Sequence, residues 1–301
     1  MNIKAAIKSM RLRTLLLSTG GVILGILLAL ADFRVSPIVA LLIILTTVCL
    51  QILSNLSNEL GDVLHGTDTP ERLGPQYGLN GGEMTVPQMK RLIGLFVALC
   101  CIFGLAMTWV SFGTIFELTP LLILLLGAGA IMAAMKYTLG RNPYGYRGLG
   151  DLYVFIFFGL VAVLGSYFVC AHEIPSWKLI LPASAVGFFS MGVLNVNNIR
   201  DMQSDAENRV TVAIKLGERK AKIYQTVLIC LGWVSMIVYC LLRIFDPWHY
   251  LFVLTLPLFI KHLRGVWSRT GRDLDPMLPL LVVSSFLFCL LGGIGFIIFL
   301  I

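Results

Sequence analysis

Two clusters of polar residues, at 55–68 and 195–205, have the composition of a cation-binding site. Each contains the spacing Asn-x-x-x-Asp and a further aspartate. The amide and carboxylate residues that we expect to bind the cation are Asn58, Asp62 and Asp68 in the first cluster and Asn197, Asp201 and Asp205 in the second. Residues four apart on a helix lie on one face, so each cluster presents a stripe of oxygen atoms. Converging carboxylates repel each other unless a cation joins them, and oxygen ligands of this kind suit Mg²⁺.

Basic residues near the clusters indicate what such a metal would hold. The segments 136–151 and 197–215 carry cations that we expect on the same side of the protein, namely Lys136, Arg141, Arg147, Arg200, Arg209 and Lys215. Mg²⁺ in enzymes typically binds one or two carboxylates together with substrate phosphate oxygens. Lys and Arg can neutralise the remaining phosphate charge. The two clusters therefore predict a site for a metal-bound polyphosphate.

The elements that must position these residues are membrane helices. Hydrophobic residues make up 57% of the chain and charged residues 13%, and the mean hydropathy is +0.87. A soluble domain is about 45–50% apolar and about a quarter charged, whereas a transmembrane helix needs about 20 mostly apolar residues. We expect an all-α membrane protein, a single domain over 1–301 with nine transmembrane helices at about 14–31, 37–55, 92–112, 120–135, 152–171, 179–196, 223–242, 247–260 and 277–301.

Gly21 and Gly25, in the first of these segments, have G-x-x-x-G spacing. Small residues at this spacing let two helices approach closely in lipid. We therefore expect a close helix contact there.

The charge distribution orients the bundle. If the N-terminus lies in the cytoplasm, 20 of the 23 lysines and arginines fall on the cytoplasmic side, and only Arg34, Lys178 and Arg243 fall outside. This is the positive-inside pattern of membrane proteins. It predicts a multi-pass protein of the cytoplasmic (inner) membrane, with both clusters at the cytoplasmic ends of the second and sixth helices. It also accounts for the net charge of +7 without nucleic acid, for which the chain has no basic aromatic motif.

Other familiar chemistries lack their motifs. The sequence contains no P-loop, no G-x-G-x-x-G fingerprint, no H-E-x-x-H and no G-x-S-x-G. The seven cysteines lie in apolar stretches and form no C-x-x-C pair, so we interpret them as small core residues. These absences argue against a nucleotide-driven pump, a dinucleotide enzyme and a serine hydrolase.

The two clusters resemble the aspartate-rich motifs of the UbiA superfamily of intramembrane prenyltransferases. That superfamily folds as nine transmembrane helices, with its motifs at the cytoplasmic ends of the second and sixth. Within it, the chain is most similar to the menaquinone-pathway branch, the 1,4-dihydroxy-2-naphthoate polyprenyltransferases. The stretches that carry this closer resemblance are residues 51–68, 72–75, 148–159 and 197–217.

The resemblance implies an Mg²⁺-dependent transferase and a role for each motif residue. Two Mg²⁺ ions, held by the six amide and carboxylate residues named above, grip the diphosphate of a polyprenyl donor and stabilise it as the allylic C–O bond breaks. Lys136 and Arg200 are expected to contact the diphosphate, and Tyr137 to stabilise the carbocation by cation–π attraction. The aromatic acceptor then attacks and loses its carboxyl group as CO₂, giving demethylmenaquinone, while the isoprenoid tail lies in the lipid bilayer.

Two alternatives stay open from the sequence. The acceptor could be 4-hydroxybenzoate or another nucleophile of a lipid pathway, and release of CO₂ separates the naphthoate from the hydroxybenzoate, which keeps its carboxyl group. The protein could also be a cation-coupled transporter, because intramembrane carboxylates often mark ion pathways. Transporter sites usually lie near the membrane midplane at broken helices, whereas both clusters here lie at one edge.

Overall fold

The computed structural model describes residues 2–67, 75–206 and 209–299. Within these ranges every element is a helix, and the one β-type pairing is a bridge between Arg147 and Val210. The expected all-α fold is thereby confirmed. Asp68 lies outside the described residues.

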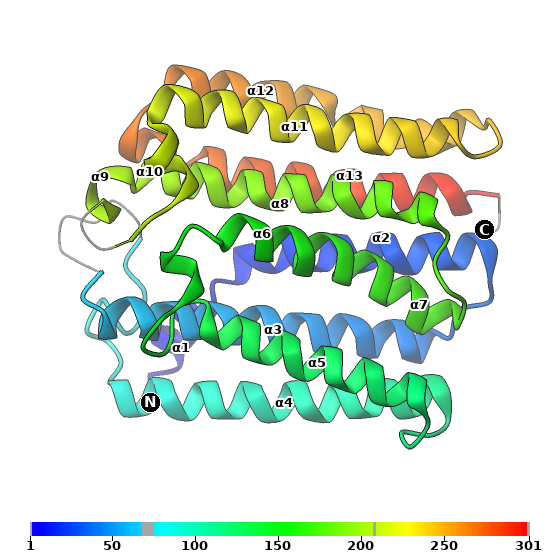
Figure 1. Ribbon diagram of the computed structural model, residues 1–301, viewed down its shortest axis with the longest axis horizontal. Coiled ribbons are helices and arrows are strands. Elements are labelled where there is room, and N and C mark those ends of the chain that lie inside the picture. The colour runs from blue at the N-terminus through cyan, green and yellow to red at the C-terminus, as the bar shows by residue number, and fades with distance from the viewer. Residues whose placement is uncertain (1, 68–74, 207–208, 300–301) are drawn as a thin grey trace.

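The long helices lie side by side along one direction (Figure 1). Their order in the chain is α1 Ile3–Met10, α2 Leu15–Asp32, α3 Pro37–Leu64, α4 Val86–Phe112, α5 Leu118–Lys136, α6 Gly150–Val154, the π-helix η3 Phe155–Gly165, α7 Ser166–Ala171, α8 Ile180–Arg200, α9 Met202–Asp205, α10 Val212–Leu216, α11 Glu218–Leu241, the 3₁₀-helix η5 Pro247–Thr255, α12 Leu256–Ser268 and α13 Met277–Ile297. Short 3₁₀ turns are η1 Leu12–Thr14, η2 Tyr144–Tyr146, η4 Trp177–Leu179 and η6 Gly271–Leu274.

Eight helical stretches of the described residues are long and apolar enough to cross a membrane, namely Ile3–Asp32, Pro37–Leu64, Val86–Phe112, Leu118–Lys136, Gly150–Ala171, Trp177–Arg200, Glu218–Leu241 and Gly271–Ile297. They coincide with eight of the nine expected segments. The ninth, 247–260, is also helical and forms η5 and the start of α12. The whole helical stretch of η5 and α12 carries His249, Lys261 and Arg264 and is less apolar than the other eight. The count of nine transmembrane helices therefore stays a prediction.

The packing forms layers that Figure 1 shows from bottom to top: α4, then α3 with α5, then α2 with α6, η3 and α7, then α8 with α13, and finally α11 with α12. The expected close contact at Gly21 and Gly25 is confirmed, because both glycines of α2 face η3. A Cβ atom on Gly21 would lie 3.0 Å from the Phe158 carbonyl oxygen, and one on Gly25 would overlap the Val163 carbonyl oxygen and the Ser166 hydroxyl. Glycine at these positions is what lets η3 pack directly on α2.

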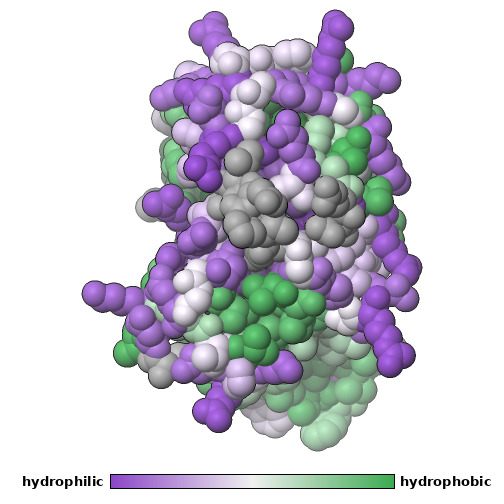
Figure 2. Space-filling model, turned by 90° about the vertical axis from the view of Figure 1, so that its left-hand side faces the viewer, coloured by the Kyte–Doolittle hydropathy of each residue, from purple (hydrophilic) through white to green (hydrophobic). Residues whose placement is uncertain are grey.

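One end of the bundle is polar. The N-terminus and the short helices α1, α9 and α10 lie at this end, and the C-terminus lies at the other (Figure 1). Figure 2 views the polar end, where hydrophilic residues surround a smaller apolar group. The α3 and α8 helices both finish here, so their last turns bring the two polar clusters to the same end of the molecule.

Candidate active site

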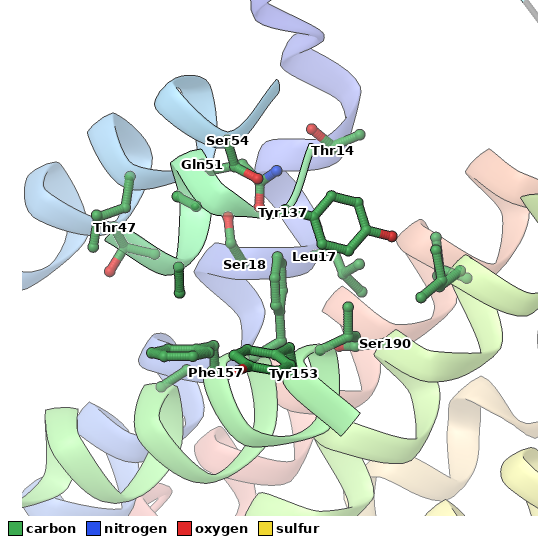
Figure 3. Close-up of a pocket in the computed structure, with 18 of the residues that line it drawn as sticks. Thr14, Leu17, Ser18, Thr47, Gln51, Ser54, Tyr137, Tyr153, Phe157 and Ser190 are labelled. Atoms are coloured by element: carbon green, nitrogen blue, oxygen red, sulfur yellow. The ribbon is translucent and has the colours of Figure 1, made fainter. Parts of the chain in front are cut away.

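A cavity of about 640 Å³ opens among α2, α3, α5, η3, α8 and α13. Asn58, Asp62, Asn197, Arg200 and Arg209 line its polar end. Its walls then become apolar along the bundle. Figure 3 shows part of this cavity, where side chains of α2 and α3 lie on one side and the rings of Tyr137, Tyr153 and Phe157 on the other. A cavity of this size lies within the range of about 300–1,000 Å³ that holds a drug-sized ligand.

The first polar cluster lies in the last two turns of α3, as its spacing predicted. Asn58 and Asp62 are one turn apart and both line the cavity. Asp62 Oδ1 accepts a hydrogen bond from Tyr146 Oη at 2.8 Å and from Arg209 Nη2 at 3.0 Å. The helix ends beyond it through Gly66, whose φ of +67° suits glycine, and Thr67 then folds back to donate to the Asp62 carbonyl oxygen. This turn fixes the Asp62 carboxylate at the cavity mouth.

A glycine allows the loop after α5 to reach this cluster. A Cβ atom on Gly61 would lie 2.5 Å from the Thr138 side chain. In the native contact, Thr138 Oγ1 donates to the Ser57 carbonyl oxygen at 2.9 Å and to Asn58 Oδ1 at 3.3 Å. The first cluster is therefore positioned by the loop as well as by its own helix.

The second cluster keeps its one-turn spacing across the end of α8, because Asp201 N donates to the Asn197 carbonyl oxygen at 3.1 Å and Asp205 N to the Asp201 carbonyl oxygen at 2.9 Å. The α8 helix ends at Arg200, Asp201 is its C-cap, and the single turn α9 carries Asp205. Arg200 holds this region together, because its guanidinium donates to Asn197 Oδ1 at 2.8 Å, to Asp201 Oδ1 at 2.8 Å and to Asp275 Oδ1 at 2.9 Å. Asp201 and Asp205 are buried, at 0% and 1% exposure. They are not among the residues that line the cavity surface.

Arg209 joins the two clusters. Its guanidinium lies 3.0 Å from Asp62 Oδ1 and 3.5 Å from Asp205 Oδ1. It also lies over the Tyr146 ring, at 4.9 Å from the ring centre. The position of Arg209 follows from a pairing of two segments far apart in the chain, since Val210 N donates to the Tyr146 carbonyl oxygen at 3.0 Å. Carboxylates from two distant segments thus share one cation, as the sequence predicted for a metal.

The donor atoms at this junction fit Mg²⁺. The site offers the carboxylates of Asp62 and Asp205 on one guanidinium, and the oxygens of Asn197 and Asp201 on another. Each guanidinium group is paired with oxygen atoms of two of these residues. Among the residues that the structure describes, no three His, Cys, Asp or Glu side chains converge. A small number of carboxylate and amide oxygens suits Mg²⁺, because this ion keeps several of its coordination positions for phosphate and water.

Of the two neighbouring residues Lys136 and Tyr137, which were both expected at the site, only Tyr137 reaches the cavity. Tyr137 lines the cavity, whereas Lys136, one residue earlier, has an exposed side chain and is absent from the cavity lining. Glu59, a further acidic residue of the first cluster, does not line the cavity. It is fully buried, and its Oε1 accepts a hydrogen bond from Leu79 N at 2.6 Å, which anchors the following loop.

Sequence reasoning missed an aromatic stack along the cavity wall. The rings of Tyr137 and Tyr144 meet edge to face at 5.3 Å, Tyr144 stacks on Tyr153 at 3.8 Å, and Tyr153 stacks on Phe157 at 6.2 Å. All four rings line the cavity. Their i, i+4 spacing within 153–157 is visible in the sequence, but the stacking across the loop requires the fold.

Two tyrosine hydroxyls at the polar end stay protonated. Burial raises the pKa of Tyr146 above its ordinary value, and the nearby Asp62 carboxylate adds to this effect. Burial likewise raises the pKa of Tyr137 to about 12, with Arg209 opposing the change and Asp62 reinforcing it. Both hydroxyls are therefore hydrogen-bond donors at neutral pH.

Comparison with known proteins agrees with this arrangement. Residues 19–287 match the model of the UbiA prenyltransferase family. A 1,4-dihydroxy-2-naphthoate octaprenyltransferase of Escherichia coli (strain K12) is 42% identical over 276 residues, which cover 91% of this chain and 87% of the relative.

Solved structures share the fold at low sequence identity. The apo structure of a UbiA homolog from Aeropyrum pernix K1 is 17% identical and superposes with a TM-score of 0.71 over 95% of this chain and 98% of that one. A UbiA homolog from Archaeoglobus fulgidus bound to GPP and Mg²⁺, also 17% identical, has a TM-score of 0.65 over 97% of this chain and 99% of that one. With its helical bundle, its paired motifs and these matches, the chain belongs to the UbiA prenyltransferase family.

Proposed function

We propose that this protein transfers a polyprenyl group from a polyprenyl diphosphate to 1,4-dihydroxy-2-naphthoate, with loss of diphosphate and CO₂, to give the hydroquinone form of demethylmenaquinone. The observation that carries the proposal is the cavity itself, which joins an acidic and basic polar end to a long apolar interior. A donor with a charged head and an isoprenoid tail has the same two parts. The E. coli relative bears this acceptor in its name, and it is 42% identical to the chain.

Mg²⁺ is the proposed cofactor, and when bound it supplies a Lewis acid that stabilises the leaving diphosphate. We assign its binding to Asp62, Asn197, Asp201 and Asp205, because these residues supply the oxygen atoms around the two guanidinium groups. Asn58 is added because it lines the cavity one turn before Asp62. Asp68 is proposed as a sixth ligand from its place in the first motif. The metal-bound state of the A. fulgidus homolog supports this cofactor.

The chain's own cations hold the remaining diphosphate charge. Arg200 and Arg209 line the cavity beside the motifs, so both can donate to phosphate oxygens. The aromatic stack of Tyr137, Tyr144, Tyr153 and Phe157 lies next along the wall. Aromatic faces attract cations, so this stack is positioned to stabilise the positive charge that develops on the allylic carbon. The apolar interior beyond it excludes water, which would otherwise capture the carbocation.

We further propose a single domain with nine transmembrane helices, a cytoplasmic N-terminus and a location in the cytoplasmic (inner) membrane. The two termini lie at opposite ends of the bundle (Figure 1), which requires an odd number of crossings. Eight long apolar helices together with the stretch of η5 and α12 give nine. The positive-inside rule then places the polar end, and with it the site, in the cytoplasm.

The test is a coupling assay with the purified protein in lipid nanodiscs. Carboxyl-labelled 1,4-dihydroxy-2-naphthoate and geranyl or farnesyl diphosphate are supplied with Mg²⁺ or with EDTA. The expected result is Mg²⁺-dependent release of labelled CO₂ in equal amount to a prenylated product. Product from 4-hydroxybenzoate, with none from the naphthoate, would move the chain to another branch of the family. Absence of coupling with every acceptor, in protein shown to be folded, would overturn the proposal.

A further inference from the structure

A second, much smaller void lies behind the cavity wall. Its volume is about 10 Å³, and its polar lining includes Tyr137, Asp151, Asn198, Arg209 and Thr211. A buried water needs a space of about 10–15 Å³ and two to four polar partners. The void therefore has the size and the lining of a site for one water molecule.

Asp151 is the acidic group of this void, and nothing in the proposed mechanism uses it. It lies in the first turn of α6 and is 7% exposed. The chain reaches this position through Gly148, whose φ is +77°. Tyr224 of α11 donates a hydrogen bond to Asp151 Oδ1 at 3.2 Å. A buried carboxylate is costly unless it is bound by hydrogen bonds or serves a function, and the structure offers it one side-chain donor and the void.

Tyr137 separates Asp151 from the large cavity. Tyr137, Asn198 and Arg209 line both the cavity and the void, so the void lies directly beside the cavity. The Tyr137 hydroxyl lies beside Gly150, at 3.1 Å from the position of a Cβ atom there, and the Asp151 charge acts on this hydroxyl. Figure 3 shows the Tyr137 ring reaching across the cavity. A proton can pass from the cavity to Asp151 along the Tyr137 hydroxyl and one water.

We propose that Asp151 receives the proton of the acceptor hydroxyl while the new carbon–carbon bond forms. The inference rests on the proposed function and names the group that activates its aromatic substrate. The acceptor O–H bond breaks and its proton goes to the Tyr137 hydroxyl oxygen, while the Tyr137 hydroxyl proton passes through the water to the Asp151 carboxylate. The electron pair left on oxygen drives the ring carbon onto the allylic carbon, and diphosphate departs with the electrons of the C–O bond. When CO₂ leaves, the pair from the C–C bond returns to the ring and its oxygen, which takes the proton back from Asp151.

This assignment explains why the acid lies apart from the motifs. A carboxylate beside the metal ligands would be neutralised by the metal and would be a poor base, whereas Asp151 lies on the other side of Tyr137. The titratable or charged groups that face the void are Tyr137, Arg209 and, through Asp151 itself, Tyr224. General-base catalysis of this kind typically contributes about 10²–10⁴-fold to a rate.

The experiment compares Asp151→Asn and Asp151→Glu in nanodiscs, with Asp32→Asn as the matched control, because Asp32 is a carboxylate at the other end of the bundle that pairs with Arg243. We expect Asp151→Asn to lower the coupling rate at neutral pH by about 100-fold or more. We expect Asp151→Glu and Asp32→Asn to retain most of it. Thermal stabilisation of the protein by Mg²⁺ with geranyl diphosphate should be equal in all variants, because the donor site is untouched.

A second readout separates proton transfer from structure. Raising the pH ionises the acceptor hydroxyl in solution, so coupling by Asp151→Asn should recover steeply with pH while the wild-type rate changes little. Coupling by Asp151→Asn within a few-fold of wild type would overturn the inference. A parallel loss of coupling and of stabilisation by the donor, without recovery at high pH, would also overturn it and leave a structural role. A wild-type protein that binds the donor but never couples would instead refute the proposed function.

Discussion

The packing of α2 on η3 gives the sharpest test of how this fold builds its cavity. Replacing Gly25 by alanine adds one methyl group where the Val163 carbonyl oxygen and the Ser166 hydroxyl already lie. The hydroxyl can rotate, but the carbonyl belongs to the backbone of η3, so η3 must move outward. The same helix carries Phe157 of the aromatic stack, and it continues from the turn that carries Tyr153.

The magnitude follows from two opposing effects. Overpacking a filled contact costs about 1–3 kcal/mol, and the backbone overlap places this substitution in the upper part of that range. Removing a glycine from a helix interior returns about 0.5–1 kcal/mol. We expect Gly25→Ala to lower the free energy of unfolding by about 1–2 kcal/mol, by difference of these terms, and to reduce coupling through displacement of the stack.

The matched control is Gly104→Ala on α4, where a Cβ atom meets nothing within 4 Å. It gains the same helix propensity without the overlap, so it should be neutral or slightly stabilising. The assay is thermal unfolding of both variants in nanodiscs, followed by the coupling rate. Equal melting temperatures for the two variants would refute the argument that Gly25 is needed for the close approach of η3.

Three further predictions concern the site. Asp201→Asn should lower coupling by about 100-fold or more, as loss of a charge-stabilising group typically does, whereas Asp32→Asn, at the other end of the bundle, should leave the rate unchanged in the same assay. Arg209→Ala should lower coupling to a similar extent because it removes the cation between the clusters, while Lys136→Ala, an exposed change worth about 0.5 kcal/mol or less, should stay near the wild-type rate. Tyr137 has a pKa of about 12 in the folded protein and near 10 in the unfolded chain. Its contribution to stability is complete below about pH 10 and is lost as the pH rises from there to about 12. Across this range the free energy of unfolding should therefore fall more steeply in wild type than in Tyr137→Phe.

Features that depend on local geometry could be predicted from the sequence. The Asn58 and Asp62 stripe follows from helix periodicity alone, and it lies in α3 as expected. The contact at Gly21 and Gly25 follows from the size of glycine, although the identity of the partner helix does not. The helix positions could also be predicted, because a long apolar run in a bilayer must satisfy its backbone hydrogen bonds internally and does so as a helix.

Features that depend on tertiary pairing could not be predicted. Asn197, Asp201 and Asp205 keep the predicted one-turn spacing. The sequence did not reveal that the Arg200 guanidinium binds both Asn197 and Asp201. Arg209 gains its role through the contact of the 209–210 segment with Tyr146, two segments far apart in the chain. Lys136 was expected to contact the diphosphate because it lies on the same side of the protein as the motifs, but its side chain is exposed and does not line the cavity.

The position of α5 has a consequence for how the protein must be handled. Its packing partners within the protein are α3 and α4, and only 6% of its apolar window is buried, yet its Gly127, Ala130 and Ala134 line the cavity. Acyl chains must therefore press on the outer face of a helix whose inner face touches the substrate. The surrounding lipid therefore helps to hold the cavity wall in place. Detergents that pack less tightly than lipid should disturb the cavity at α5 first.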